Sequence, residues 1–127
     1  MLVKEIMNKV CVITSDITLK KAAGLMLENN MGSLIILKKS KLAGILTERD
    51  IIKNLSSLNK NISKIMTKKL ITISQNAPLE SAAEIMKKNK IKRIIVIDNK
   101  KTKPIGIITA TDIIVNSDLL NEDGVLI

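Results

Sequence analysis

The sequence predicts an α+β protein built from two pseudo-symmetric β-α-β-β-α repeats that pack through their sheets. Three segments recur in the same order: VKEIMNK at 3–9 as ISKIMTK at 62–68, LKKAAGLM at 19–26 as LESAAEIM at 79–86, and LAGILTERDII at 42–52 as PIGIITATDII at 104–114. Matches in a fixed order at nearly constant spacing indicate an internal repeat. We therefore divide the chain into repeat 1 (1–55), a linker (56–61), repeat 2 (62–116) and a C-terminal tail (117–127) that either docks on a neighbour or is disordered.

The first helix of each repeat is predicted by apolar residues at positions i, i+3, i+4 and i+7, which share one helical face. These positions are Leu19, Ala22, Ala23 and Met26 in repeat 1, and Leu79, Ala82, Ala83 and Met86 in repeat 2. Asp16 or Thr18 suits the N-cap in repeat 1, and Pro78 suits the first turn in repeat 2. The six methionines are interpreted as flexible filler of the core.

Two short β-branched runs follow each helix and predict two strands joined by a lysine-rich turn. They lie at 34–37 and 42–46 in repeat 1, and at 94–97 and 105–108 in repeat 2. A second helix is expected to begin just after Thr47 and just after Thr109. One repeat alone is too small to bury its sheet well, so we expect the two copies to pack face to face.

The composition favours a binding protein over an enzyme. The 127 residues include no histidine and a single cysteine, Cys11, so the commonest general base and multi-cysteine metal sites are absent. We expect Cys11 to be a buried thiol that behaves as a small hydrophobic side chain. No apolar run is long enough to span a membrane, and the N-terminus lacks the apolar segment of a secretory signal. These features predict a cytoplasmic protein with no metal and no required cofactor.

The net charge of +9 predicts attraction to anions. The sequence argues against nucleic acid as a partner, because the chain has no aromatic side chain on which a base could stack and its lysines follow no helical stripe. A small phosphorylated ligand remains open. So does the interpretation that most lysines only make the surface soluble.

The repeated motif Gly-x-x-Thr-x-x-Asp, at 44–50 and 106–112, supports two interpretations. In the first, the Thr and the Asp form a capping box and do no more than start the helix, while the glycine permits close packing. In the second, the hydroxyl and the free helix amides bind an anion while the carboxylate accepts from the diol of a ribose, which makes a nucleoside phosphate site. The local sequence is compatible with both.

From IMNK and LKKAAGLM through the two strands to GILTERD, the pattern resembles the CBS domain, the module named after cystathionine β-synthase. The resemblance covers about residues 3–55 and 62–116 as a tandem pair, and the order and spacing of the motifs carry it. It implies two clefts between the repeats that bind adenosine compounds such as AMP, ADP, ATP or S-adenosylmethionine. It also implies that ligand occupancy regulates an attached or partner protein.

The resemblance further implies which residues line the two clefts. In each cleft, the Thr and Asp of one repeat hold ribose and phosphate, and residues of the other repeat hold the adenine. One cleft combines Thr47 and Asp50 with Thr72, Ala77 and Ile91. The other combines Thr109 and Asp112 with Val12, Ile17, Met31 and Gly32, and adds Lys92 and Arg93 for phosphates. Val12 stands where the family prefers threonine, which removes a polar contact from the second cleft.

We therefore expect an adenine-nucleotide binding and sensing module that performs no catalysis and acts on a separate, unidentified protein. A homodimer is expected because the exposed apolar helix faces of a small pair would otherwise contact water. Two alternatives stay open: a dimerisation module without a ligand, and a basic protein associated with nucleic acid.

Overall fold

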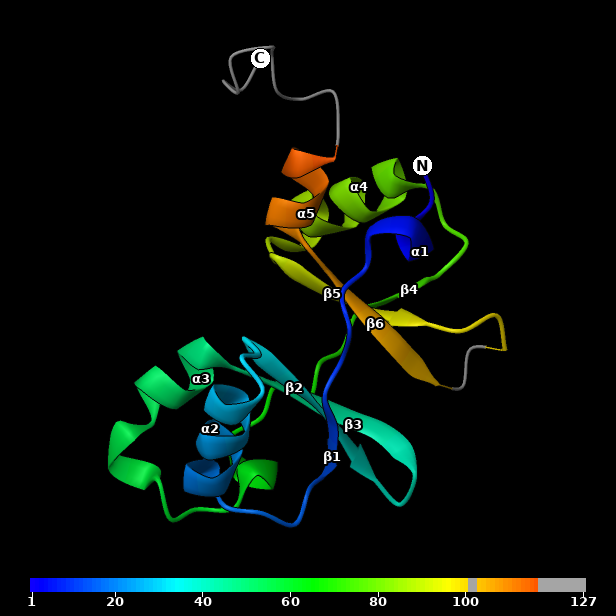
Figure 1. Cartoon of the computed structure of the whole chain (residues 1–127). Helices are drawn as coiled ribbons and strands as arrows, with labels where there is room; N and C mark the ends of the chain where they lie inside the picture. Colours follow the sequence, from blue (N-terminus) through cyan, green and yellow to red (C-terminus); the bar gives the residue numbers. More distant parts are fainter. Residues whose placement is uncertain (101–102, 117–127) are drawn as a thin grey trace. The chain divides into compact units, whose positions relative to one another are not determined.

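The computed structural model describes residues 1–100 and 103–116 (Figure 1). Its helices are α1 (Val3–Ile6), α2 (Leu19–Glu28), α3 (Glu48–Lys53), α4 (Leu79–Asn89) and α5 (Ala110–Val115), with 3-10 turns η1 (Leu55–Ser57) and η2 (Ile62–Lys64). Its strands are β1 (Val12–Thr14), β2 (Ser33–Lys38), β3 (Lys41–Thr47), β4 (Thr72–Ser74), β5 (Arg93–Ile97) and β6 (Pro104–Thr109). The α+β class and the order strand, helix, strand, strand, helix in each repeat are confirmed.

Contacts divide the chain into two compact units. We call Val10–Leu70 the central unit, and Met1–Lys9 together with the residues from Ile71 onward the split unit. None of the described helices is long and apolar enough to cross a bilayer. The tail at 117–127 lies outside the described residues.

The central unit contains a three-stranded sheet with β2 in the middle. β1 runs parallel to β2, with Val12 opposite Ile35, and β3 runs antiparallel to it, with Ser33 opposite Thr47. Since side chains alternate between the two faces of a strand, Leu34 and Ile36 point the same way. That face packs against α2, and the resulting core consists of Leu19, Ala22, Met26, Leu34, Ile36, Leu46, Ile62 and Met66.

The split unit repeats this arrangement with β5 in the middle of its sheet. β4 runs parallel to β5, with Thr72 opposite Ile95, and β6 runs antiparallel, with Arg93 opposite Thr109. Figure 1 shows α1 and the two later helices, α4 and α5, gathered in this unit. Its core consists of Val3, Ile73, Leu79, Ala82, Met86, Ile94, Val96, Ile108 and Ile113.

The opening segment of each repeat packs on the sheet of the other repeat. The Val3 N–H donates to the Ala77 carbonyl at 2.9 Å, and the Ile62 N–H donates to the Ile17 carbonyl at 3.0 Å. Val3 and Ile62 are fully buried. The compact units therefore exchange their opening segments and do not coincide with the sequence repeats at 1–55 and 62–116.

The helix starts follow the sequence with one small difference. The Thr18 hydroxyl caps α2 by accepting from the Lys21 N–H at 3.2 Å, so Thr18 and not Asp16 is the N-cap. Pro78 was expected in the first turn of α4, but it is the N-cap, because its ψ of 151° is extended and the helix begins at Leu79.

Candidate functional site

The first candidate site is the corner where β3 ends and α3 begins. Thr47 is the N-cap of α3, and its N–H donates to Asp50 Oδ2 at 2.8 Å. The Asp50 N–H donates in return to Thr47 Oγ1 at 3.4 Å, which completes a capping box. The Thr47 hydroxyl also donates to Asp50 Oδ2, at 3.2 Å. Both side chains are half-buried.

The corner between β6 and α5 has the same construction. The Thr109 N–H donates to Asp112 Oδ2 at 2.9 Å, and the Asp112 N–H donates to Thr109 Oγ1 at 3.2 Å. The hydroxyl donates to the same Oδ2, at 2.7 Å. A third side chain takes part here, because Asn8 Nδ2 donates to Asp112 Oδ2 at 2.6 Å.

The capping-box interpretation of the repeated motif is therefore confirmed at both corners. The geometry is also compatible with ligand binding, because all these bonds from side chain and backbone donors end on one carboxylate oxygen. Oδ1 of Asp50 and Oδ1 of Asp112 accept from no residue that the structure describes. The threonine hydroxyl, in contrast, must rotate away from the carboxylate before it can donate to a ligand.

Other predicted residues lie beside these corners within the same unit. In the central unit the Glu48 N–H donates to the Gly32 carbonyl at 3.2 Å, so Gly32 lies next to the start of α3. In the split unit the Ala110 N–H donates to the Lys92 carbonyl at 2.9 Å, and Arg93 pairs with Thr109 across the sheet. The structure thus brings Lys92, Arg93, Thr109 and Asp112 together.

The remaining predicted residues are distributed over both units. Val12 lies on β1 and is 40% exposed, while Ile17 and Met31 flank α2. Thr72 lies on β4, Ala77 precedes α4 and Ile91 follows it. The Ala77 N–H already donates to the Ser74 carbonyl at 3.1 Å. Each predicted cleft draws residues from both units, so the combination of residues in each cleft remains a prediction.

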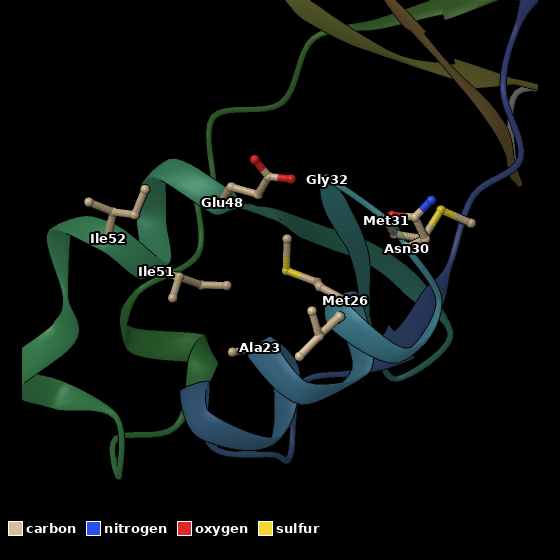
Figure 2. Close-up of a pocket in the computed structure, with 9 residues that line it drawn as sticks. Ala23, Met26, Asn30, Met31, Gly32, Glu48, Ile51 and Ile52 are labelled. Atoms are coloured by element: carbon tan, nitrogen blue, oxygen red, sulfur yellow. The ribbon is translucent and has the colours of Figure 1, made fainter.

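A groove lies between α2 and α3 in the central unit (Figure 2). Its volume is about 470 Å³, and Met26 of α2 and Ile51 of α3 face each other across it. Met31 and Gly32 are predicted site residues that also line it. Nearby Leu27 and Ile52 are 84% and 67% exposed. The groove is mainly apolar, and Gly32 and Glu48 place one end of it beside the Thr47–Asp50 corner.

Sequence reasoning missed Asn8, the partner of Asp112. It lies in the repeated segment VKEIMNK, where repeat 2 has ISKIMTK, so the Asn and Thr at this position were a visible difference between the copies. Among the described residues, no three Cys, Asp or Glu side chains lie close enough to hold a metal ion.

The geometry describes a tandem repeat whose copies end in the same Thr-Asp corner. The family model for the CBS domain matches residues 3–57 and again residues 62–117. The chain belongs to the CBS-domain family. The predicted resemblance is thereby confirmed, and most of the chain lies in the two CBS domains.

Curated relatives contain the CBS pair in different settings. The chain is 35% identical over 114 residues to L-aspartate semialdehyde sulfurtransferase of Methanocaldococcus jannaschii. This match covers 88% of the present chain but only 22% of that enzyme. The chain is also 29% identical over 119 residues to the CBS domain-containing protein YhcV of Bacillus subtilis. That match covers 90% of the present chain and 84% of YhcV. The CBS pair is thus a small part of one relative and most of the other.

A similar solved structure is the CBS domain pair of protein MJ0100 in complex with methylthioadenosine and S-adenosyl-L-methionine. The TM-score is 0.79 and the identity is 35%, with 89% of this chain and 92% of that chain covered. A related CBS pair therefore binds adenosine compounds.

Proposed function

We propose that this CBS pair is a binding and sensing module for an adenine nucleotide or an S-adenosyl compound. The observation that carries the proposal is the Thr-Asp corner, which occurs once in each unit with Oδ1 of its carboxylate free of described donors. In dinucleotide-binding folds an Asp or Glu carboxylate accepts from a ribose hydroxyl, and the same chemistry is available here. The MJ0100 pair, which holds two adenosine compounds at 35% identity, supports the same ligand class.

The two corners differ in the charge beside them. Lys92 comes directly before β5. Arg93 is the first residue of β5 and the cross-strand partner of Thr109. The corresponding positions before β2 are Gly32 and Ser33, which carry no charge. We therefore assign the more highly phosphorylated ligand to the Thr109–Asp112 corner and the less charged ligand to the Thr47–Asp50 corner.

The bound ligand is a regulatory signal and not a substrate. Each carboxylate is held in a capping box, and the chain has no histidine to act as a general base. The ligand then acts through a change in affinity for a separate protein, which the sequence does not identify.

The α2–α3 groove supports a homodimer. Leu27 and Ile52 line it and are each more than 60% exposed, and exposed apolar patches of this kind mark protein interfaces. A second copy of the chain offers the same patch in a two-fold interface. Met31 and Gly32 line this groove and are also predicted ligand residues, so Ile52, which is not a predicted ligand residue, is the position that tests dimerisation separately.

A thermal-shift screen against AMP, ATP, S-adenosylmethionine and duplex DNA tests the proposed function. A ligand of the native state at 100 times its Kd stabilises that state by about 2.7 kcal/mol, which is a clear rise in melting temperature. We expect a rise with at least one adenosine compound. A rise with duplex DNA alone would support the nucleic-acid alternative, and no rise with any probe would favour a purely structural module.

A further inference from the structure

Asn8 reaches Asp112 because the backbone on either side holds it there. The Asn8 N–H donates to the Ile107 carbonyl at 2.8 Å, and the Ile107 N–H donates to the Asn8 carbonyl at 3.1 Å. These two hydrogen bonds pair Asn8 with Ile107 of β6. Ile107 comes two residues before Thr109 on the same strand. From that position the Asn8 amide donates to Asp112 Oδ2 at 2.6 Å.

The other corner has the same bridge but a different side chain. Thr67 occupies the position of Asn8 in repeat 2 and exchanges hydrogen bonds of 2.9 and 3.0 Å with Ile45 of β3. In the part of the chain that the structure describes, the Thr67 side chain makes no hydrogen bond to Asp50. Asp50 Oδ2 therefore accepts from two protein donors and Asp112 Oδ2 from three.

We infer that Asn8 is a positioning residue that orients Asp112 for the ligand and makes the two corners unequal in affinity. This inference rests on the proposed function. With three donors on Oδ2, rotation of the Asp112 carboxylate breaks three hydrogen bonds, so Oδ1 is held in one place. When a ligand hydroxyl binds to a carboxylate that is already held in this way, the carboxylate loses little further freedom, and binding is stronger. Asp50 has two donors, and its bond from the threonine hydroxyl is longer, so its carboxylate is less constrained.

The position of the ligand oxygen is thus set by a residue that does not touch the ligand. Asn8 contributes its effect through Asp112, and a threonine at the same place contributes none. Exchanging the two side chains should therefore move the effect from one corner to the other.

The test is calorimetric titration of AMP into full-length variants in which one corner is silenced. In an Asp50→Ala background, which reports the Asp112 corner, Asn8→Ala should weaken AMP binding about 3- to 10-fold. In an Asp112→Ala background, which reports the Asp50 corner, Thr67→Asn should strengthen binding by a similar factor. Thr67→Ala is the matched control, and it should leave both affinities unchanged.

A spectroscopic measurement without ligand separates positioning from a general effect on folding. The side-chain amide resonances of Asn8 should move in Asp112→Ala and stay in place in Asp50→Ala. Unchanged AMP affinity in Asn8→Ala, or Asn8 resonances that ignore Asp112→Ala, would overturn the inference while leaving the proposed function intact. If the unmutated chain binds no AMP, ATP or S-adenosylmethionine, the proposed function fails and the inference falls with it.

Discussion

Met66 lies so close to Gly44 that a β-carbon at position 44 would come within 2.6 Å of the methionine sulfur. The same contact occurs in the split unit, where a β-carbon on Gly106 would lie 2.5 Å from the Met7 sulfur. In each unit the methionine of the opening segment therefore packs directly on the glycine of the repeated motif, in space that a β-carbon would occupy. This explains why Gly and Met recur together in both repeats.

We expect Gly44→Ala to lower the free energy of unfolding by about 1–3 kcal/mol, because the added methyl group overpacks the contact with Met66. Gly24→Ala is the matched control. Gly24 lies inside α2, and a β-carbon there would meet no heavy atom within 4 Å. Since alanine is favoured over glycine in a helix, the control should raise stability by roughly 0.5–1 kcal/mol. Urea unfolding measures both, and a stabilised Gly44→Ala would refute the packing argument.

The Gly106 contact can be tested by its coupling to Met7. Gly106→Ala and Met7→Ala should each destabilise the chain, but the double variant should lose less than the sum of the two. The smaller side chain leaves room for the new methyl group. A positive coupling of about 0.5 kcal/mol or more is expected for residues in direct contact. Additive losses in a double-mutant cycle would show that the two side chains do not compete for the same space.

Lys90→Gly should stabilise the chain by about 1 kcal/mol. Lys90 is the C-cap of α4 and has a left-handed conformation, with φ 53° and ψ 44°, which glycine adopts without a steric penalty. Lys88→Gly makes the same chemical change inside the same helix and should destabilise by roughly 1 kcal/mol. Thermal melting of the two variants should give shifts of opposite sign. Shifts of the same sign would mean that charge, and not backbone conformation, dominates at these positions.

Asp50→Asn and Asp112→Asn separate ligand binding from helix capping. Asparagine keeps an oxygen acceptor for the cap but loses the negative charge that favours a ribose hydroxyl. Each change should weaken nucleotide binding at its own corner by about 5- to 30-fold. The loss of the acidic charge near the helix start should cost only about 0.3–1 kcal/mol of stability. If both variants bind like the unmutated chain yet melt several degrees lower, the motif is a cap alone.

The charge beside Thr109 predicts a difference in salt dependence. Lys92 is exposed and Arg93 is half-buried, so their attraction for phosphates is screened by salt. Titrations of ATP and AMP at two salt concentrations should show the steeper loss for ATP at the Asp112 corner. Lys92→Gln should reduce that slope. Lys4→Gln, which removes the same charge from an exposed position on α1, should leave it unchanged.

Ile52→Glu should convert a dimer into a monomer, because it places a charge on the exposed apolar rim of the α2–α3 groove. Lys20→Gln is the control, since it changes the net charge by the same amount at an exposed position of α2. Light scattering at micromolar concentration distinguishes the two states. A mass of one chain for the unmutated protein would contradict the homodimer.

Local patterns predicted most of the secondary structure correctly. The run 34–37 lies inside β2, and the spacing from Leu19 to Met26 lies inside α2, because burial on one face imposes a period that single residues reveal. The capping boxes were also visible, since Thr47 and Asp50 interact three residues apart.

The exchange of opening segments could not be predicted in this way. Val3 and Ile62 are single apolar residues at the start of short segments, and such a segment does not specify which of two similar sheets it will contact. The contact of Asn8 with Asp112 joins residues 104 positions apart, so it follows from that exchange and not from any local pattern. The same limit applies to the predicted clefts, whose residues come from both repeats.

The exchanged segments also impose an order on folding during synthesis. Val10–Leu70 is one continuous stretch, so everything that the central unit needs is present once residue 70 has left the ribosome. Residues 1–9 emerge before the central unit, yet they pack on a sheet whose last strand, β6, ends at Thr109. Until then the sheet that buries Val3 in the finished chain is incomplete. Because domains generally fold as they are made, we expect the central unit to form early. The split unit is completed only when β6 has been synthesised and residues 1–9 pack on its sheet.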